Sequence, residues 1–206
     1  ELRRRQSGYG RGSRQRIERD AIRFWAGIHQ GVTLGSPLAL MVANRDWENW
    51  REREVAPWRR PRPGHADLAG GVKYGLPDLR LVAERASART TAAQVAVGAV
   101  AKALLGCVGI AVGSYVEAIG GVNAQLDDMP LSQRLAQALE SDVACPDPAT
   151  AEHMRARIDR AKEDGDSLGG IICIVASGLP VGLGTHVHWD RRLDGRLAQA
   201  VMSVQA

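Results

Sequence analysis

The residues with the clearest capacity for chemistry lie in two short segments, 62–67 and 84–89. The first reads Arg-Pro-Gly-His-Ala-Asp and the second Glu-Arg-Ala-Ser-Ala-Arg. His65 follows Pro63-Gly64, a pair that favours a turn and lets the backbone approach a ligand closely. An imidazole can donate or accept a proton near neutral pH, so His65 is the best candidate for proton chemistry. The alternative is a turn histidine that is hydrogen-bonded to its own loop.

A third arginine-rich segment, residues 3–14, opens the chain and also carries three glycines and a tyrosine. The guanidinium fork of arginine binds carboxylates and phosphates bidentately. Three such segments, one with a histidine at its centre, predict a site for a small polyanionic molecule. Two other interpretations of residues 3–14 stay open: an Arg-Gly segment that contacts RNA, and a solvated run of charge.

Metal and membrane chemistry are not expected. His186 and His188 would share a face of a strand, but no third ligand is near them in the sequence. The three cysteines are far apart and lack metal-ligand spacing, which is typical of reduced thiols in a cytoplasmic protein. We find no apolar run that approaches the roughly 18 residues needed to cross a bilayer.

The elements that must position these residues follow from apolar periodicity and turn signals. At 206 residues, with 45% apolar and 24% charged residues, the chain can bury a sizeable core. A helix that begins near Ser87 would direct free backbone N–H groups at an anion. The exposed tryptophans of 47–60 suggest a surface that a partner subunit covers. The pattern predicts strands over 17–25, 37–44, 110–119 and 171–176, helices over 86–105, 147–162 and 193–204, and loops over 3–14 and 47–60.

Taken together and in order, these segments resemble the chorismate synthase family. The matching segments are RRRQSGYGRGSR, GVTLGSPLAL, NRDWENW, PRPGHADLAGGVKYG, ERASARTTAAQVAVGAVAKALL, DGDSLGG, LPVGLG and LDGRLAQAVMSVQA. The resemblance covers residues 1–206 as one domain, incomplete at both ends. It implies an α+β fold in which a helical layer lies between two antiparallel sheets, a β-α-β sandwich. It also implies a cytoplasmic homotetramer.

The resemblance further implies an enzyme of the shikimate pathway of aromatic amino acid biosynthesis. The reaction is the 1,4-anti elimination of phosphate from 5-enolpyruvylshikimate 3-phosphate to give chorismate, with reduced FMN. By position, His65 would supply a proton beside the flavin. Some members reduce their flavin with NADPH, which would lie near Arg5 and Arg11. The substrate's anionic groups would contact Arg5, Arg11, Arg14, Arg62 and Arg89, and the FMN site would include Arg85, Ala86, Ser87, Gln205 and Ala206.

The chain also departs from the family pattern. Thr90 and Gln94 stand where the family usually has Glu and Arg. The family's Gly-Glu-Ser-His-Gly segment and its later flavin-binding and Arg-Ser-Asp segments do not occur in the sequence. We therefore expect the 206-residue chain alone to bind FMN poorly and to turn over little. The alternatives are an arginine-rich nucleic-acid-binding module, and an inactive truncated relative that acts as an assembly partner.

Overall fold

A computed structural model describes residues 1–12 and 19–204 of the chain. Of the predicted site residues, Arg14, Gln205 and Ala206 lie outside the described residues. The chain divides into two compact units, and each is described by itself. The first contains Glu1, Arg3–Arg19 and Val100–Pro180; the second contains Leu2, Asp20–Ala99 and Val181–Ala206.

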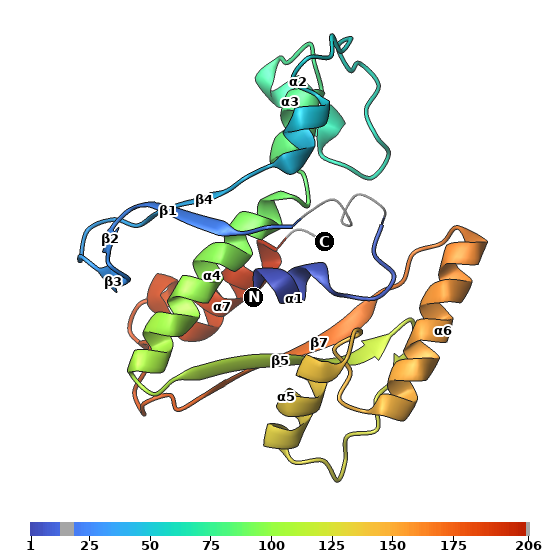
Figure 1. Ribbon diagram of the computed structural model, residues 1–206. Helices are drawn as coiled ribbons and strands as arrows, with labels where there is room; N and C mark the ends of the chain where they lie inside the picture. The colour runs from blue at the N-terminus through green and yellow to red at the C-terminus, as the bar shows by residue number, and fades with distance from the viewer. Residues whose placement is uncertain (13–18, 205–206) are drawn as a thin grey trace. The chain divides into compact units, whose positions relative to one another are not determined.

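The first unit is built on a three-stranded antiparallel sheet with the strand order β6-β5-β7. Its long central strand β5 (Ala111–Ile119) pairs along its whole length with β7 (Gly170–Ser177), with an irregularity between Val116 and Ala118. The short β6 (Val122–Asn123) folds back on β5 through a turn at Gly120-Gly121. Figure 1 shows β5 and β7 running side by side, with α5 below them and α6 to their right in this view.

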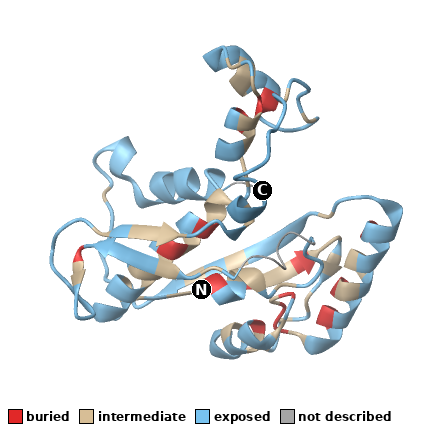
Figure 2. Cartoon of the chain, turned by 45° about the horizontal axis from the view of Figure 1, so that its top comes forward, coloured by how far each residue is buried: buried red, intermediate tan, exposed pale blue. Residues whose placement is uncertain are grey.

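Two helices of the first unit cover this sheet: α5 (Leu131–Glu140) and α6 (Pro148–Asp164). The Asp147 carboxylate caps α6 by accepting the Ala149 N–H at 3.1 Å, and Pro148 follows at the first helical position. The helix ends at Gly165, which adopts the left-handed conformation. Figure 2 shows buried positions on one side of α6, where Met154 is fully buried in a core with Val143, Cys145 and Ala151.

The second unit contains two small antiparallel ribbons. Strand β1 (Ile22–Ala26) pairs with β4 (Ala39–Val42), and β2 (Ile28–His29) pairs with β3 (Val32–Thr33). Gln30 and Gly31 both have positive φ at the tip of the second hairpin, as a tight two-residue turn requires. The two ribbons are continuous along the chain (Figure 1).

The helices of the second unit include α2 (Asp67–Tyr74) and α3 (Arg80–Arg85), which pack together (Figure 1). A Cβ on Gly70 would lie 2.4 Å from a Val82 methyl, and one on Gly71 would lie 2.5 Å from a Leu79 methyl. The two glycines therefore allow the close approach of α2 to α3. Helix α4 (Thr90–Cys107) begins in this unit and ends in the first, and α7 (Leu193–Met202) follows a single 3₁₀ turn, Trp189–Arg191.

The structure confirms the α+β class, because helices accompany small antiparallel sheets. The predictions for 110–119, 147–162, 171–176 and 193–204 are confirmed within a few residues. The loop predicted over 3–14 is wrong at its start, because Leu2–Gln6 precedes the glycines and forms the short helix α1. Residues Arg45–Asn49 likewise form a 3₁₀ helix (η2), where part of a loop was expected.

One apolar stretch of the chain corrects the expectation that no segment is long and apolar enough to cross a membrane. Among the described residues, the stretch Arg80–Cys107, which spans α3 and α4, contains an 18-residue window with a mean hydropathy of 1.3, so by length and composition alone it could cross a membrane. A helix that packs inside a protein meets the same criterion, so this finding is weak evidence for a membrane span.

Candidate functional site

His65 lies in the loop that leads into α2. Its Nδ1 is 2.8 Å from the Pro63 carbonyl oxygen. A carbonyl oxygen only accepts, so Nδ1 carries the hydrogen and Nε2 is the ring atom left to exchange a proton with a ligand. Gly64, with φ +69°, makes the left-handed turn between the two partners, and no heavy atom lies within 4 Å of where its Cβ would be. The imidazole is exposed, with its tautomer set by its own loop.

The Arg62 side chain is tied to Asp67, the first residue of α2. The Arg62 Nε and Nη2 donate to the two carboxylate oxygens of Asp67, each at 2.9 Å, and the Arg62 backbone N–H donates to Oδ2 at 3.0 Å. Asp67 is fully buried, while the Arg62 side chain is 36% exposed. The hydrogen bonds from Arg62 lower the pKa of Asp67 to about 2, and the same pairing raises the pKa of Arg62.

The Arg62 guanidinium lies over the Trp58 ring, with its Cζ 5.1 Å from the ring centroid. Trp58 is itself fixed, because its backbone N–H donates to Asp78 at 3.0 Å and its carbonyl accepts from Leu79 at 2.8 Å. Asp78 also receives the Arg80 guanidinium, which holds the pKa of Asp78 far below its usual range. Arg62 is thus held along one edge by a carboxylate and on one face by an indole.

Arg89 occupies a different kind of setting. Its Nη1 and Nη2 donate to the two Asp20 carboxylate oxygens, each at 2.7 Å, and Nη2 also donates to the Ala43 carbonyl at 3.1 Å. The Arg89 side chain is 18% exposed and the Asp20 side chain is 2% exposed. Asp20 precedes β1 and Ala43 follows β4, so Arg89 joins the open end of this ribbon to the start of α4.

Arg85, Ala86 and Ser87 form the junction between α3 and α4. Arg85 is exposed, whereas Ala86 and Ser87 are half-buried. The amides of residues 89–92 all donate to acceptors within residues 87–89, among them the Ser87 Oγ, which accepts from Arg89 at 3.2 Å. The sequence prediction of free N–H groups at this helix start is therefore wrong, because a tight turn satisfies them and α4 begins only at Thr90. An anion at this junction would meet the Arg85 side chain and the Ser87 hydroxyl.

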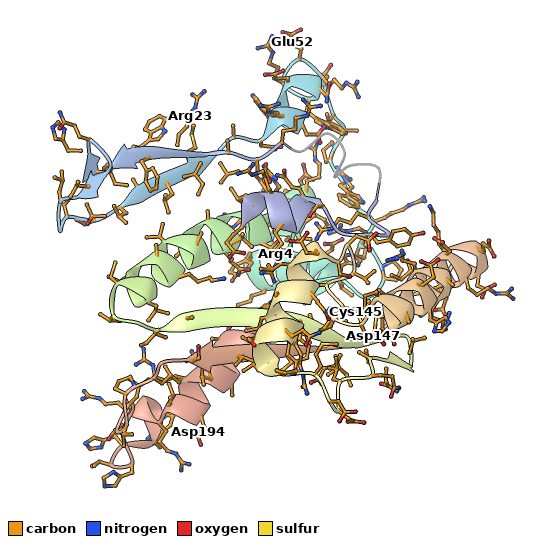
Figure 3. All side chains as sticks on the ribbon, turned by 60° about the horizontal axis from the view of Figure 1, so that its bottom comes forward. Arg4, Arg23, Glu52, Cys145, Asp147 and Asp194 are labelled. Atoms are coloured by element: carbon orange, nitrogen blue, oxygen red, sulfur yellow. The ribbon has the colours of Figure 1, made fainter. Side chains whose placement is uncertain are left out.

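The opening arginines belong to the first unit. Arg4 in α1, labelled in Figure 3, donates to the Ser114 hydroxyl of β5 at 2.7 Å. Arg5 is half-buried in the same short helix, and Arg11 is exposed in the glycine-rich segment that follows. A Cβ on Gly8 would lie 2.7 Å from the Arg11 Nε, so Gly8 leaves room for that side chain.

Tyr9 fastens the glycine-rich segment to the first unit. Its hydroxyl donates to Asp159 of α6 at 2.7 Å, which raises the pKa of Tyr9, and its backbone N–H donates to the Asp142 carbonyl at 2.9 Å. A Cβ on Gly10 would lie 2.7 Å from an Ile158 methyl. The backbone therefore lies close against α6 between Arg5 and Arg11.

Among the described residues, no group of three or more His, Cys, Asp or Glu side chains could hold a metal ion. His186 and His188 lie in the turns before the 3₁₀ helix η3 (Trp189–Arg191) and not on a strand, so the shared strand face that the sequence suggested does not form. Figure 3 shows Cys145 beside the α6 cap Asp147, and burial raises the pKa of the Cys145 thiol.

The model of one protein family, described as chorismate synthase, matches residues 1–206. The chain belongs to the chorismate synthase family. A chorismate synthase of Symbiobacterium thermophilum is 54% identical over 221 residues, and one of Aquifex aeolicus is 48% identical over 225 residues. Each alignment covers 100% of this chain and 56% of the relative.

A crystal structure of chorismate synthase is similar in fold, with a TM-score of 0.82 at 44% sequence identity. The match covers 100% of this chain and 56% of that chain. The chain thus spans about half the length of the curated chorismate synthases it matches.

Within this member of the chorismate synthase family, the carboxylates that hold the predicted arginines were not predicted from the sequence. Asp67 was noted as a neighbour of His65 without a role, although its spacing of five residues from Arg62 is a local signal. Asp20 lies 69 residues from Arg89, so no local pattern could have paired them.

Proposed function

We propose that this protein is a carbon–oxygen lyase that converts 5-enolpyruvylshikimate 3-phosphate into chorismate and phosphate by 1,4-anti elimination. The family match over the whole chain supports this reaction. The structural observation that carries the proposal is the loop of residues 62–67. It presents an exposed imidazole of defined tautomer beside an anchored guanidinium, as proton transfer next to a polyanion requires.

The substrate carries two carboxylates and a phosphate, and arginine side chains are its proposed partners. We assign Arg5, Arg11, Arg14, Arg62 and Arg89 to this role by their positions in the family pattern. The geometry of Arg62 supports its assignment best. The Asp67 carboxylate accepts hydrogen bonds from the Nε and Nη2 of Arg62, and no hydrogen-bond partner of the Arg62 Nη1 occurs among the described residues. An incoming oxyanion could therefore bind the outer edge of this guanidinium without breaking the existing pair.

In the reaction, the C–O bond to phosphate breaks, a hydrogen leaves the ring on the opposite face, and a second ring double bond forms. Reduced FMN bound at this site would supply electron density transiently to the reacting ring system, which it would regain by the end of the elimination. We propose that the Nε2 of His65 holds or delivers the proton exchanged beside that ring system. Its Nδ1–H, committed to the Pro63 carbonyl, keeps the imidazole in one orientation.

The junction of α3 and α4 fits a phosphate-bearing cofactor by the chemistry of its donors. Arg85 offers an exposed cation, Ser87 a hydroxyl, and Ala86 a small side chain that does not obstruct a flat ring. We therefore propose Arg85, Ala86 and Ser87, together with Gln205 and Ala206, as the FMN-binding residues. NADPH is the proposed flavin reductant, with Arg5 and Arg11 as the cations nearest its phosphates.

The proposed assembly is a cytoplasmic homotetramer. Large apolar side chains are exposed on the chain, including Trp25 at 72% and Trp189 at 85%. Burial of such side chains between subunits would stabilise an oligomer. Cys107, Cys145 and Cys173 are free thiols, as expected in a reducing compartment.

An anaerobic assay tests the proposed function. The purified protein, as the cell makes it, is mixed with 5-enolpyruvylshikimate 3-phosphate and photoreduced FMN, and phosphate and chorismate are both quantified. We expect equimolar release of the two products, and a loss of about a hundredfold or more in kcat for His65→Ala. The matched control is His153→Ala, which removes an exposed imidazole from α6. Full activity of His65→Ala would refute the proton-transfer role of His65. Absence of both products with the wild-type protein would refute the proposed lyase function.

A further inference from the structure

Asp67 connects the two ends of the loop that carries His65. Its carboxylate receives three N–H groups from Arg62 at one end of the loop, while its own backbone begins α2 at the other. In the described part of the chain, the other hydrogen bonds of residues 62–66 are the one between His65 and Pro63 and the Ala66 carbonyl bond into α2. Without Asp67, therefore, only the contact of Arg62 with the Trp58 ring and local turn preference would set the position of the Pro63 carbonyl.

We propose that Asp67 is the positioning residue of this site: by clasping Arg62 it fixes the Pro63 carbonyl, which in turn fixes the tautomer and orientation of His65. The same carboxylate aligns the outer edge of the Arg62 guanidinium. This inference rests on the proposed function of His65 and extends it to a buried group that itself touches no substrate.

The requirement is for a carboxylate of aspartate length. Three N–H donors converge on two oxygens in a fully buried position, so both oxygens must accept. An asparagine would turn its own NH₂ toward at least one of these donors, which would leave buried polar groups unsatisfied. A glutamate adds a methylene where the side chain is enclosed, and it would push the loop away from α2.

The tautomer of His65 is the readout that a merely structural role would not change. With ¹⁵N-labelled histidine in the whole protein, ring nitrogen shifts report which nitrogen carries the hydrogen in the neutral form. We expect a single Nδ1–H form in the wild type. In Asp67→Asn we expect a mixture with the Nε2–H form that a free imidazole prefers. We also expect kcat to fall by about tenfold to a hundredfold, because displacement of a reacting group by about 1 Å lowers a rate by up to about a hundredfold.

Asp147→Ala is the matched control. It also removes an aspartate that is hydrogen-bonded to backbone, and loss of this α6 cap lowers the melting temperature. Because Asp147 belongs to the first unit and its hydrogen bonds to Ala149 and Thr150 stay within the first turn of α6, the tautomer and kcat of this variant should match the wild type. A melting temperature lowered in both variants, with altered His65 signals in Asp67→Asn alone, supports the proposal.

An unchanged tautomer in Asp67→Asn overturns the proposal, whatever happens to kcat. If Asp67→Asn does not fold, Arg62→Lys decides, because lysine keeps the charge but cannot fork; an unchanged tautomer there also overturns it. A His65→Ala protein with full activity would instead refute the proposed function of His65. The ring signals of the wild type and Asp67→Asn would still show whether Asp67 sets the loop.

Discussion

Arg62 and Arg89 have the same partner chemistry in the second unit, yet their aspartates hold them in opposite ways. Asp67 holds Arg62 side-on, through Nε and Nη2, and closes a loop of a few residues. Asp20 holds Arg89 end-on, through Nη1 and Nη2, across 69 residues of sequence. The first pairing keeps the outer edge of the guanidinium accessible, whereas the second occupies it and adds the Ala43 carbonyl.

The difference separates an arginine with one accessible edge, for which we propose a ligand-binding role, from an arginine that connects parts of the fold. Arg62 is half-buried in a loop and lies over the Trp58 ring, so it is both fixed and accessible. Arg89 is 18% exposed and connects the flanks of β1 and β4 to α4. Both were assigned to the substrate by family position. The geometry favours that role for Arg62 more strongly than for Arg89.

The largest expected effect is a loss of folding stability when the Asp20–Arg89 pair is broken. Asp20→Ala leaves a largely buried guanidinium without its partner, and breaking a buried pair from one side costs about 3–5 kcal/mol. Denaturant unfolding would measure the loss. The double variant Asp20→Leu/Arg89→Met should recover much of it, because it leaves no uncompensated charge. A loss below about 1 kcal/mol for Asp20→Ala would show that the pair does not hold the fold.

Replacing each arginine with lysine sharpens the contrast in function. Arg62→Lys keeps the charge but cannot engage a carboxylate and an oxyanion together, so we expect KM for the substrate to rise about tenfold. Arg89→Lys should instead lower the melting temperature with a smaller change in KM. Steady-state kinetics and thermal unfolding of both variants make the test. The reverse pattern would exchange the two assignments.

Elements with local signals were predictable from the sequence. The α6 helix has an aspartate cap, a proline at its first position and a glycine at its end, and β7 is rich in isoleucine and valine. The loop around His65 was also predictable, because Pro63 and Gly64 favour a turn wherever they stand.

Helix α2 was missed because its two glycines look like turn signals. In the structure, Gly70 and Gly71 allow close packing against Val82 and Leu79, which is a tertiary reason invisible in sequence. The same limit applies to the site: the residues that hold Arg89 flank the paired strands β1 and β4, far from Arg89 in the sequence. Side chains that could do chemistry were therefore found from the sequence, but the groups that position them were not.

A smaller effect is expected at the turn that lets Asp67 reach Arg62. Gly64 has a φ of +69°, and no heavy atom lies within 4 Å of its missing Cβ. Gly64→Ala should therefore cost about 1 kcal/mol, because of backbone strain alone and not steric clash. Gly64→Asn should cost less, because asparagine tolerates this region better. Thermal unfolding would rank the three proteins, and an alanine variant as stable as the wild type would show that the turn can relax.

The effect most specific to the Asp67 clasp lies in acid. The folded-state pKa of Asp67 is lowered to about 2, below the unfolded value of about 3.9. Its stabilising contribution is therefore complete above about pH 5 and is lost as the pH falls toward 2. Asp67→Asn lacks this titration, so the gap in melting temperature between the two proteins should narrow between about pH 5 and pH 2. Asp78, whose pKa Arg80 also lowers, is common to both proteins and cancels in the comparison. A gap that stays constant with pH would mean that the charge of Asp67 contributes nothing to the clasp, and that the shape of its side chain alone holds Arg62.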